Sequence, residues 1–361
     1  MHGKKKIIII SPYPFGEAPS QRFRFEQYLD HLAGRGTEVT VKPFLSLATW
    51  RILYQPGNAL KKAMGVASGF INRFFVLFTL PRYDFVFVHR EATPIGPPVF
   101  EWIVAKIFRK KIIYDFDDAI WLPNTSSENK IIAWLKWHGK VKSICRWSYR
   151  ISCGNEFLAG FAKKYNRQVT VNPTTIDTEH LHQHSEELKR KNEKVIIGWT
   201  GTHSTLLYLS ALQEVFLKLA DQFKDTIGFL IIADKPPDMK IEFEFVKWSK
   251  ENEMKDLLKM DIGVMPLPDN DWAKGKCGFK ALQYMALEIA TVASPVGVNS
   301  SIIAHEKDGL LCSTSNEWYA ALSRLIEDAS LREKIGKAGR AKVVSHYSVV
   351  SNSSNFLSLF E

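Results

Sequence analysis

Three carboxylates, Asp115, Asp117 and Asp118, follow directly on a short β-branched run in the first half of the chain. Carboxylates this close repel one another unless they accept hydrogen bonds or bind a ligand. A pair of them could hold a divalent cation, the group could bind sugar hydroxyls, or it could cap the next helix. We expect no metal at these carboxylates. We expect instead that Asp117 orients an acceptor or a sugar and that Asp118 and His89 lie on the same side of the site.

A loop rich in proline and glycine separates the first β-type run from a helical segment. It contains Gly16 and leads to Arg22 and Arg24. Backbone N–H groups at a helix start can hold an anion, and the two arginines would add positive charge. We therefore place Gly16 and Arg22 on the acceptor or sugar side; the alternative is a plain turn with surface arginines.

Three lysines, Lys274, Lys276 and Lys280, gather around the expected start of a helix in the second half. Lysines at a helix start are typical of a phosphate-binding site. Earlier in the same half, the sequence GWTGT contains Gly201 and Thr202 after a β-type run, and its glycines let a phosphate approach the backbone. We predict that Gly201, Thr202 and Lys280 hold a diphosphate. The alternative is an exposed basic loop.

These residues would be positioned by alternating strands and helices. The predicted strands of the first half are 6–10, 38–41, 84–89, 111–115, 151–154 and 169–172, with helices over 22–34 and 97–109. Those of the second half are 195–198, 228–233, 261–265 and 291–294, with helices over 204–223, 251–260, 279–287, 316–327 and 330–346. Such alternation predicts parallel sheets covered by helices on both faces.

The pattern restarts after a polar stretch, 178–193, in which we expect a linker or exposed helix and no metal site at His180, His182 and His184. A chain of 361 residues is long for one core. We therefore expect an acceptor-side domain over 1–178, a donor domain over 179–345, and a tail, 346–361, that packs back on the first domain. Ligands of open α/β sheets bind at the carboxyl ends of the strands.

The formal net charge of +10 favours an anionic partner, and no zinc-finger or RNA-binding motif suggests a nucleic acid. The four cysteines form no C-x-x-C pair, which favours a reduced, cytoplasmic compartment. Residues 60–83 are basic, aromatic and apolar. They could lie peripherally on the cytoplasmic face of an anionic membrane, near a lipid-linked acceptor, or form a buried helix of the first domain.

Several segments of the second half resemble the donor-binding region of GT-B-fold glycosyltransferases of the retaining, family-4-like type. They are 261–266 (DIGVMP), Gly278-Phe279, 282–286 (LQYMA), 291–297 (TVASPVG) and 308–311 (DGLL), and 172–177 (NPTTID) resembles the crossover into that region. The resemblance implies an α/β GT-B fold, in which two Rossmann-like domains face a central cleft. It also implies a nucleotide-diphosphate sugar as donor, bound by Lys276, Gly278, Phe279 and Gln283.

By the same resemblance, the chain is a glycosyltransferase that retains anomeric configuration, needs no metal or cofactor, and acts on a lipid-linked acceptor or polysaccharide precursor. Two family carboxylates are replaced, by Gly275 and by Gln283, and the arginine of the family's phosphate clamp is replaced by Trp199. Gln283 could still contact the ribose, and Lys276 or Lys280 would have to supply the missing charge. These departures motivate an alternative: a catalytically inactive subunit that binds nucleotide sugars and scaffolds a partner enzyme.

Overall fold

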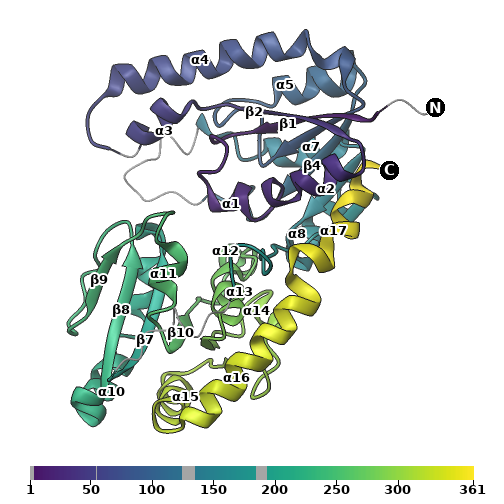
Figure 1. Cartoon of the computed structure of the whole chain (residues 1–361). Helices are drawn as coiled ribbons and strands as arrows, with labels where there is room; N and C mark the ends of the chain where they lie inside the picture. Colours follow the sequence, from purple (N-terminus) through teal and green to yellow (C-terminus); the bar gives the residue numbers. More distant parts are fainter. Residues whose placement is uncertain (1–3, 54, 124–134, 184–192) are drawn as a thin grey trace. The chain divides into compact units, whose positions relative to one another are not determined.

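The computed structural model describes residues 4–53, 55–123, 135–183 and 193–361 (Figure 1). The chain divides into two compact units. Unit 1 comprises Met1–Thr174 and Asn352–Glu361, and unit 2 comprises Thr175–Ser351. The first boundary and the start of the returning tail thus differ by a few residues from the expected 178/179 and 346.

Unit 1 is built on a six-stranded sheet in the order β2-β1-β3-β4-β5-β6, with every pair parallel. Its strands are β1 (Lys6–Ser11), β2 (Glu38–Pro43), β3 (Phe85–His89), β4 (Lys111–Phe116), β5 (Arg150–Cys153) and β6 (Val169–Val171). The four consecutive isoleucines of β1 are fully buried. Strands covered on both faces require such continuous apolar runs, because neither face meets water.

The helices of unit 1 connect these strands. They are α1 (Pro19–Arg22), η1 (Glu26–Tyr28), α2 (Leu29–Gly34), α3 (Leu47–Leu53), α4 (Ala59–Leu77), η2 (Leu80–Arg82), α5 (Val99–Trp102), the π-helical turn η3 (Ile103–Ile107), α7 (Lys140–Trp147) and α8 (Glu156–Lys163). Among the described residues, no helix is both long and apolar enough to traverse a bilayer.

Unit 2 contains a second six-stranded parallel sheet, in the order β12-β11-β10-β7-β8-β9. Its strands are β7 (Val195–Gly201), β8 (Ile227–Ala233), β9 (Glu244–Lys247), β10 (Ile262–Met265), β11 (Ala290–Ala293) and β12 (Leu310–Leu311). The strand order reverses between β7 and β10, and ligands of open α/β sheets bind at the carboxyl ends of the strands at such a reversal. The loops after β7 and β10 are therefore the first place to look for a site.

The helices of unit 2 are mostly short and several begin with a side-chain cap. They are η5 (His203–Thr205), α9 (Leu206–Ser210), α10 (Gln213–Phe223), η6 (Lys224–Thr226), α11 (Glu253–Leu257), α12 (Asp271–Lys274), α13 (Phe279–Ala286), α14 (Asn299–Ile302), α15 (Ser315–Glu327), α16 (Ala329–Lys342) and the π-helical turn η7 (Val343–Tyr347). Thr314 and Glu317 form a capping box at α15, which satisfies backbone N–H groups that the helix leaves unpaired.

Helix α17 (Val349–Leu357) and the turn η8 (Ser358–Phe360) carry the chain from unit 2 back into unit 1. Within unit 1, Phe356 stacks on Tyr28 with ring centroids 4.4 Å apart, and Phe360 packs edge-on against Phe85. The last residues are therefore part of the core of unit 1.

The predicted α/β fold class, with two Rossmann-like domains, is confirmed by the two parallel sheets with their helices. The sequence missed β9 and β12. The single helices expected over 22–34 and 204–223 are each broken into shorter pieces. His184 lies outside the described residues.

Candidate active site

The loop after β7 in unit 2 lies where the strand order reverses. Gly201 ends β7, and a Cβ on this residue would approach the Trp199 ring to 2.4 Å and the Thr205 hydroxyl to 2.8 Å. A side chain there would force its neighbours to move, so the loop requires glycine. Thr202 follows in an extended conformation, and its carbonyl accepts hydrogen bonds from the backbone and hydroxyl of Thr205. Thr202 itself is exposed, and phosphate binding by this loop stays a prediction.

Lys280 stands at the first turn of α13 and reaches toward this loop. Its ammonium lies 4.5 Å from the centroid of the Trp199 ring and 3.4 Å from the Thr205 hydroxyl. Burial, with the neighbouring charge of Lys276, lowers the pKa of Lys280 to about 7. Two cations held close together favour an anion between them. The structure thus places Lys280 beside the loop of Gly201 and Thr202, with Lys276 close enough to lower its pKa.

The start of α13 is shaped by Gly278, which precedes Phe279 in the left-handed region with φ of 69°. A Cβ there would meet Ile302 at 2.2 Å, so glycine is required for both conformation and space. Lys276 lies over the Trp272 ring, whereas Lys274 is in ion-pair contact with Asp269 at 3.1 Å. The charge of Lys274 is therefore matched by Asp269.

Gln283, which the resemblance assigns to the nucleotide ribose, is 2% exposed. Its amide nitrogen lies 3.4 Å from the Glu253 carboxylate and 3.5 Å from the ring of His182, and both of these residues are buried too. The side chain therefore belongs to a buried polar cluster of unit 2. Its contact with a ribose stays a prediction.

His203 and Asp234 form an ion-pair contact that the sequence did not reveal. The Asp234 carboxylate accepts from the His203 backbone at 2.6 Å and lies 2.6 Å from its Nδ1. This contact fixes the loop after β7 to the end of β8. Neither residue lies in a recognisable motif. Their positions just after two adjacent parallel strands were the available signal.

In unit 1, Asp115 is the centre of a buried network. Its carboxylate is paired with Arg24, accepts from the Ser152 hydroxyl at 2.6 Å and lies 2.8 Å from His89 Nδ1. Burial alone would raise the pKa of Asp115. The Arg24 guanidinium and the His89 ring outweigh burial and hold the pKa of this carboxyl well below its ordinary value. Asp115 is thus an ionised, fully paired group of the interior.

This network corrects one expectation. Arg24 was expected to add positive charge to an anion site, but its side chain is 1% exposed, and it also donates to the Asn172 carbonyl. Its charge therefore neutralises Asp115 inside the unit. His89, predicted on the acceptor or sugar side, is fully buried, and its Nε2 has no hydrogen-bond partner in the part of the chain that the structure describes.

Asp117 and Asp118 are held by Arg90, a residue with φ of 60° at the end of β3. Its guanidinium donates to Asp118 at 2.6 Å and lies 3.7 Å from Asp117. Burial lowers the pKa of Arg90, but the two carboxylates raise it above its ordinary value. Within the described ranges, no cluster of three or more His, Cys, Asp or Glu side chains is arranged as a metal site. The aspartates instead have arginines as counter-ions.

The first loop of unit 1 is rigidly hydrogen-bonded. Gln21 exchanges hydrogen bonds with the backbone of Tyr13 at 2.9 and 3.0 Å, and the Gly16 N–H donates to Glu26 at 2.9 Å. Gly16 has φ of 77°, which favours glycine. Arg22 lies over the Phe23 ring. The sequence analysis singled out this loop but missed the roles of Gln21 and Glu26, which fix its shape.

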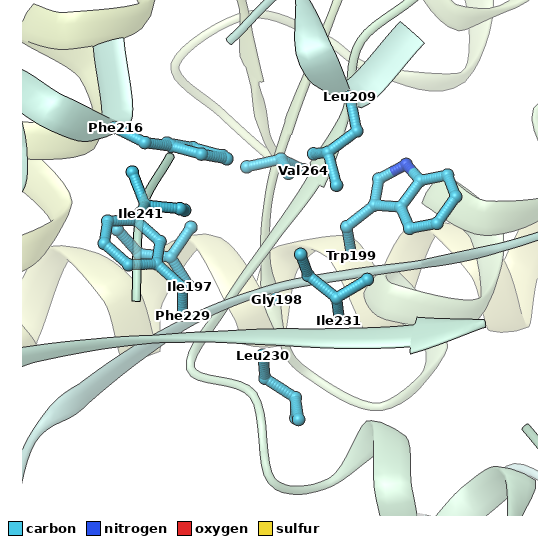
Figure 2. Close-up of a pocket in the computed structure, with 10 residues that line it drawn as sticks. All are labelled: Ile197, Gly198, Trp199, Leu209, Phe216, Phe229, Leu230, Ile231, Ile241 and Val264. Atoms are coloured by element: carbon cyan, nitrogen blue, oxygen red, sulfur yellow. The ribbon is translucent and has the colours of Figure 1, made fainter. Parts of the chain in front are cut away.

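An apolar gap in unit 2 is a packing defect and not a ligand site. Figure 2 shows side chains of Ile197, Phe216, Phe229 and Ile241 close together around it, with Trp199 further along β7. Its volume is about 10 Å³, which holds a single water at most. These residues belong to the hydrophobic core. This gap is therefore too small to hold a nucleotide.

Comparison with known proteins agrees with this geometry. Residues 238–342 match the family model described as glycosyl transferases group 1. No curated protein matches the chain. The solved structures similar to it include sucrose-phosphate synthase from Thermosynechococcus elongatus, at 13% identity and a TM-score of 0.68, covering 99% of this chain and 98% of that one.

Two further structures are similar over nearly the whole chain. A glycosyltransferase from Rickettsia africae has 11% identity and a TM-score of 0.69, covering 99% of this chain and 98% of that one. HepE from Anabaena, solved in complex with UDP-glucose, has 12% identity and a TM-score of 0.66, with 98% of each chain covered. Identities this low show the fold alone. The chain therefore has the GT-B fold, and its residues 238–342 match the model of group 1 glycosyl transferases.

Proposed function

We propose that the chain transfers a sugar, with retention of anomeric configuration, from a nucleotide-diphosphate sugar to a lipid-linked acceptor or polysaccharide precursor. The observation that carries this proposal is the position of Lys280. A partly buried ammonium is held over Trp199, beside a second lysine, at the start of α13 and next to the glycine loop after β7. This arrangement suits a diphosphate better than any neutral ligand.

The same groups suit the reaction. When the bond between the sugar and the diphosphate breaks, negative charge grows on the leaving diphosphate. Backbone N–H groups at the start of α13 and the ammonium of Lys280 are fixed in advance, so they stabilise that charge without rearranging. Lys280 thus replaces the clamp arginine of similar enzymes. That HepE binds UDP and UDP-glucose supports a uridine nucleotide as the first donor to try.

The acceptor side is proposed at the carboxyl end of the unit 1 sheet. Asp117 and Asp118 lie just after β4 and are partly exposed, with side chains 13% and 17% accessible. Arg90 fixes their orientation. Carboxylates held in this way can accept hydrogen bonds from sugar hydroxyls, and we assign that role to Asp117.

The proposal is tested by incubating the purified chain with a panel of nucleotide sugars, with and without lipid-phosphate and oligosaccharide acceptors. Thermal unfolding ranks the donors first, because a ligand that binds the native state raises its apparent stability. We expect one donor to stabilise the chain and to be turned over, with release of the nucleoside diphosphate. A chain that binds no nucleotide sugar contradicts the proposal.

A second candidate is a catalytically inactive subunit that binds the donor and scaffolds a partner enzyme. Position 275 is a buried glycine without a carboxylate, and Gln283 is engaged with Glu253. Donor binding without hydrolysis or transfer, for every acceptor tried, would favour this alternative.

A further inference from the structure

Helix α4 of unit 1, the long helix at the top of Figure 1, packs through its smallest residues. A Cβ on Gly65 would lie 2.3 Å from the Thr49 hydroxyl, and one on Gly69 would lie 2.6 Å from the Phe44 ring. The helix therefore approaches the rest of the unit too closely for larger side chains. Val76 completes this buried side.

A buried arginine fixes the same side of α4. Arg73 is 2% exposed and donates to the carbonyls of Ala92 and Ser11 at 2.8 and 2.7 Å, and to that of Lys42 at 2.8 Å. Burial lowers its pKa to about 9. These bonds link α4 to the ends of β1 and β2, so its rotation about its own axis is fixed.

The opposite side of α4 exposes its large apolar residues. They are Leu60 (74% exposed), Met64 (64%), Ile71 (56%), Phe74 (57%), Phe75 (62%) and Phe78 (66%), the last directly after the helix. At 3.6 residues per turn they fall within an arc of about 100°. Small residues inside and large apolar ones outside reverse the usual pattern of a surface helix. We call this set of six residues the apolar face of α4.

The surroundings of this face are basic. Besides the buried Arg73, residues 39–83 contain five lysines and arginines, and they contain no aspartate or glutamate. Just beyond, at the amino ends of β3 and β4, a surface cavity of about 300 Å³ is lined by Arg109, Lys110 and Lys111, with one carboxylate, Asp84. That carboxylate already accepts from the Lys6 backbone at 2.7 Å. The cavity begins five residues after Phe78 in the chain.

From these observations we infer that the apolar face of α4 docks unit 1 onto an anionic lipid bilayer. The phenylalanines enter the interface between headgroups and acyl chains, and the lysines and arginines around them attract the anionic headgroups. Residues 39–83 contain no acidic residue, which favours a lipid surface over a second copy of the chain. An interface between two copies is stabilised by pairs of opposite charges, and this segment supplies charges of one sign. This inference does not depend on sugar transfer.

The test is sedimentation of the full chain with vesicles of phosphatidylcholine alone or mixed with phosphatidylglycerol, at low and high salt. The variant is Phe74→Ser/Phe75→Ser/Phe78→Ser. Its control, Leu207→Ser/Val344→Ser, removes exposed apolar side chains from unit 2. We expect the wild type and the control to bind mixed vesicles in a salt-sensitive way. The triple variant should bind them about a hundredfold more weakly. Unchanged thermal unfolding of the triple variant shows that it folds.

A second variant, Lys61→Gln/Lys62→Gln, keeps the apolar face and removes two charges. It should lose most of its preference for phosphatidylglycerol over phosphatidylcholine. The inference is overturned if the wild type fails to bind mixed vesicles at low salt, or if the triple variant binds them as the wild type does. It is also overturned if the triple substitution abolishes a dimer seen in solution while vesicles are not bound.

Discussion

Replacing Arg24 by methionine removes the guanidinium partner of Asp115 while keeping a side chain of similar length. Both residues are 1% exposed, so the variant leaves a buried carboxylate with only Ser152 and His89 as partners. Removing one partner of a buried ion pair costs about 3–5 kcal/mol, because the remaining charge is uncompensated. The control is Lys163→Met, whose pair with Glu156 is exposed and contributes about 0–1 kcal/mol.

Hydrogen exchange of the β4 amides measures this loss, because it reports the opening of unit 1 without assuming that the whole chain unfolds in one step. The direction in which the stability of unit 1 changes with pH follows from the lowered pKa of Asp115. In the wild type its folded pKa is depressed, so its contribution is present at neutral pH and is lost only below about pH 4. In the variant the buried carboxyl gains from protonation, so the deficit should shrink as pH falls from about 7 to 5. A deficit as small as that of the control, at every pH, would refute the reasoning.

Two further predictions concern α13 and α4. Because the pKa of Lys280 is about 7 and a bound diphosphate favours its charged form, affinity for UDP-glucose should fall about tenfold between pH 6 and 8. Calorimetry in buffers of different ionisation heat should show proton uptake, and Lys280→Arg should remove both effects. Gly69→Ala should destabilise unit 1 by about 1–3 kcal/mol, because the new methyl group meets Phe44. Gly160→Ala in α8, where a new methyl group meets open space, is the comparison for steric crowding, and equal hydrogen exchange of α4 in the two variants would disprove the tight packing.

Most strands were predictable because they carry a continuous apolar run that is buried on both faces, as Ile7 to Ile10 illustrate. The edge strands β2 and β6 were predicted although they are only partly buried. The strands that were missed lack this signal. β9 lies at an edge and reads EFVK, and β12 has two residues. Helix 204–223 breaks near Ala211, in a region where apolar periodicity continues, so periodicity alone does not locate the break.

The position of Lys280 near the loop after β7 was predictable, because the carboxyl ends of parallel strands and the starts of the helices that follow them meet at one edge of a sheet. The pairing of buried charges could not be predicted from the sequence. Arg24 and Asp115 are 91 residues apart, and only the fold brings them together. The sequence likewise left open whether residues 60–83 are buried or lie on a membrane. In the structure one side of α4 is buried and the other carries the exposed apolar face.

The central claim is that Lys280 binds the diphosphate of the donor. Titration calorimetry with UDP-glucose on the wild type, Lys280→Ala and Lys274→Ala tests it most directly. Loss of a charge-assisted hydrogen bond costs about 1.5–3 kcal/mol, so Lys280→Ala should bind roughly 10–150-fold more weakly. Lys274→Ala, whose side chain is paired with Asp269, should bind nearly as the wild type does. Wild-type affinity in Lys280→Ala would contradict the account.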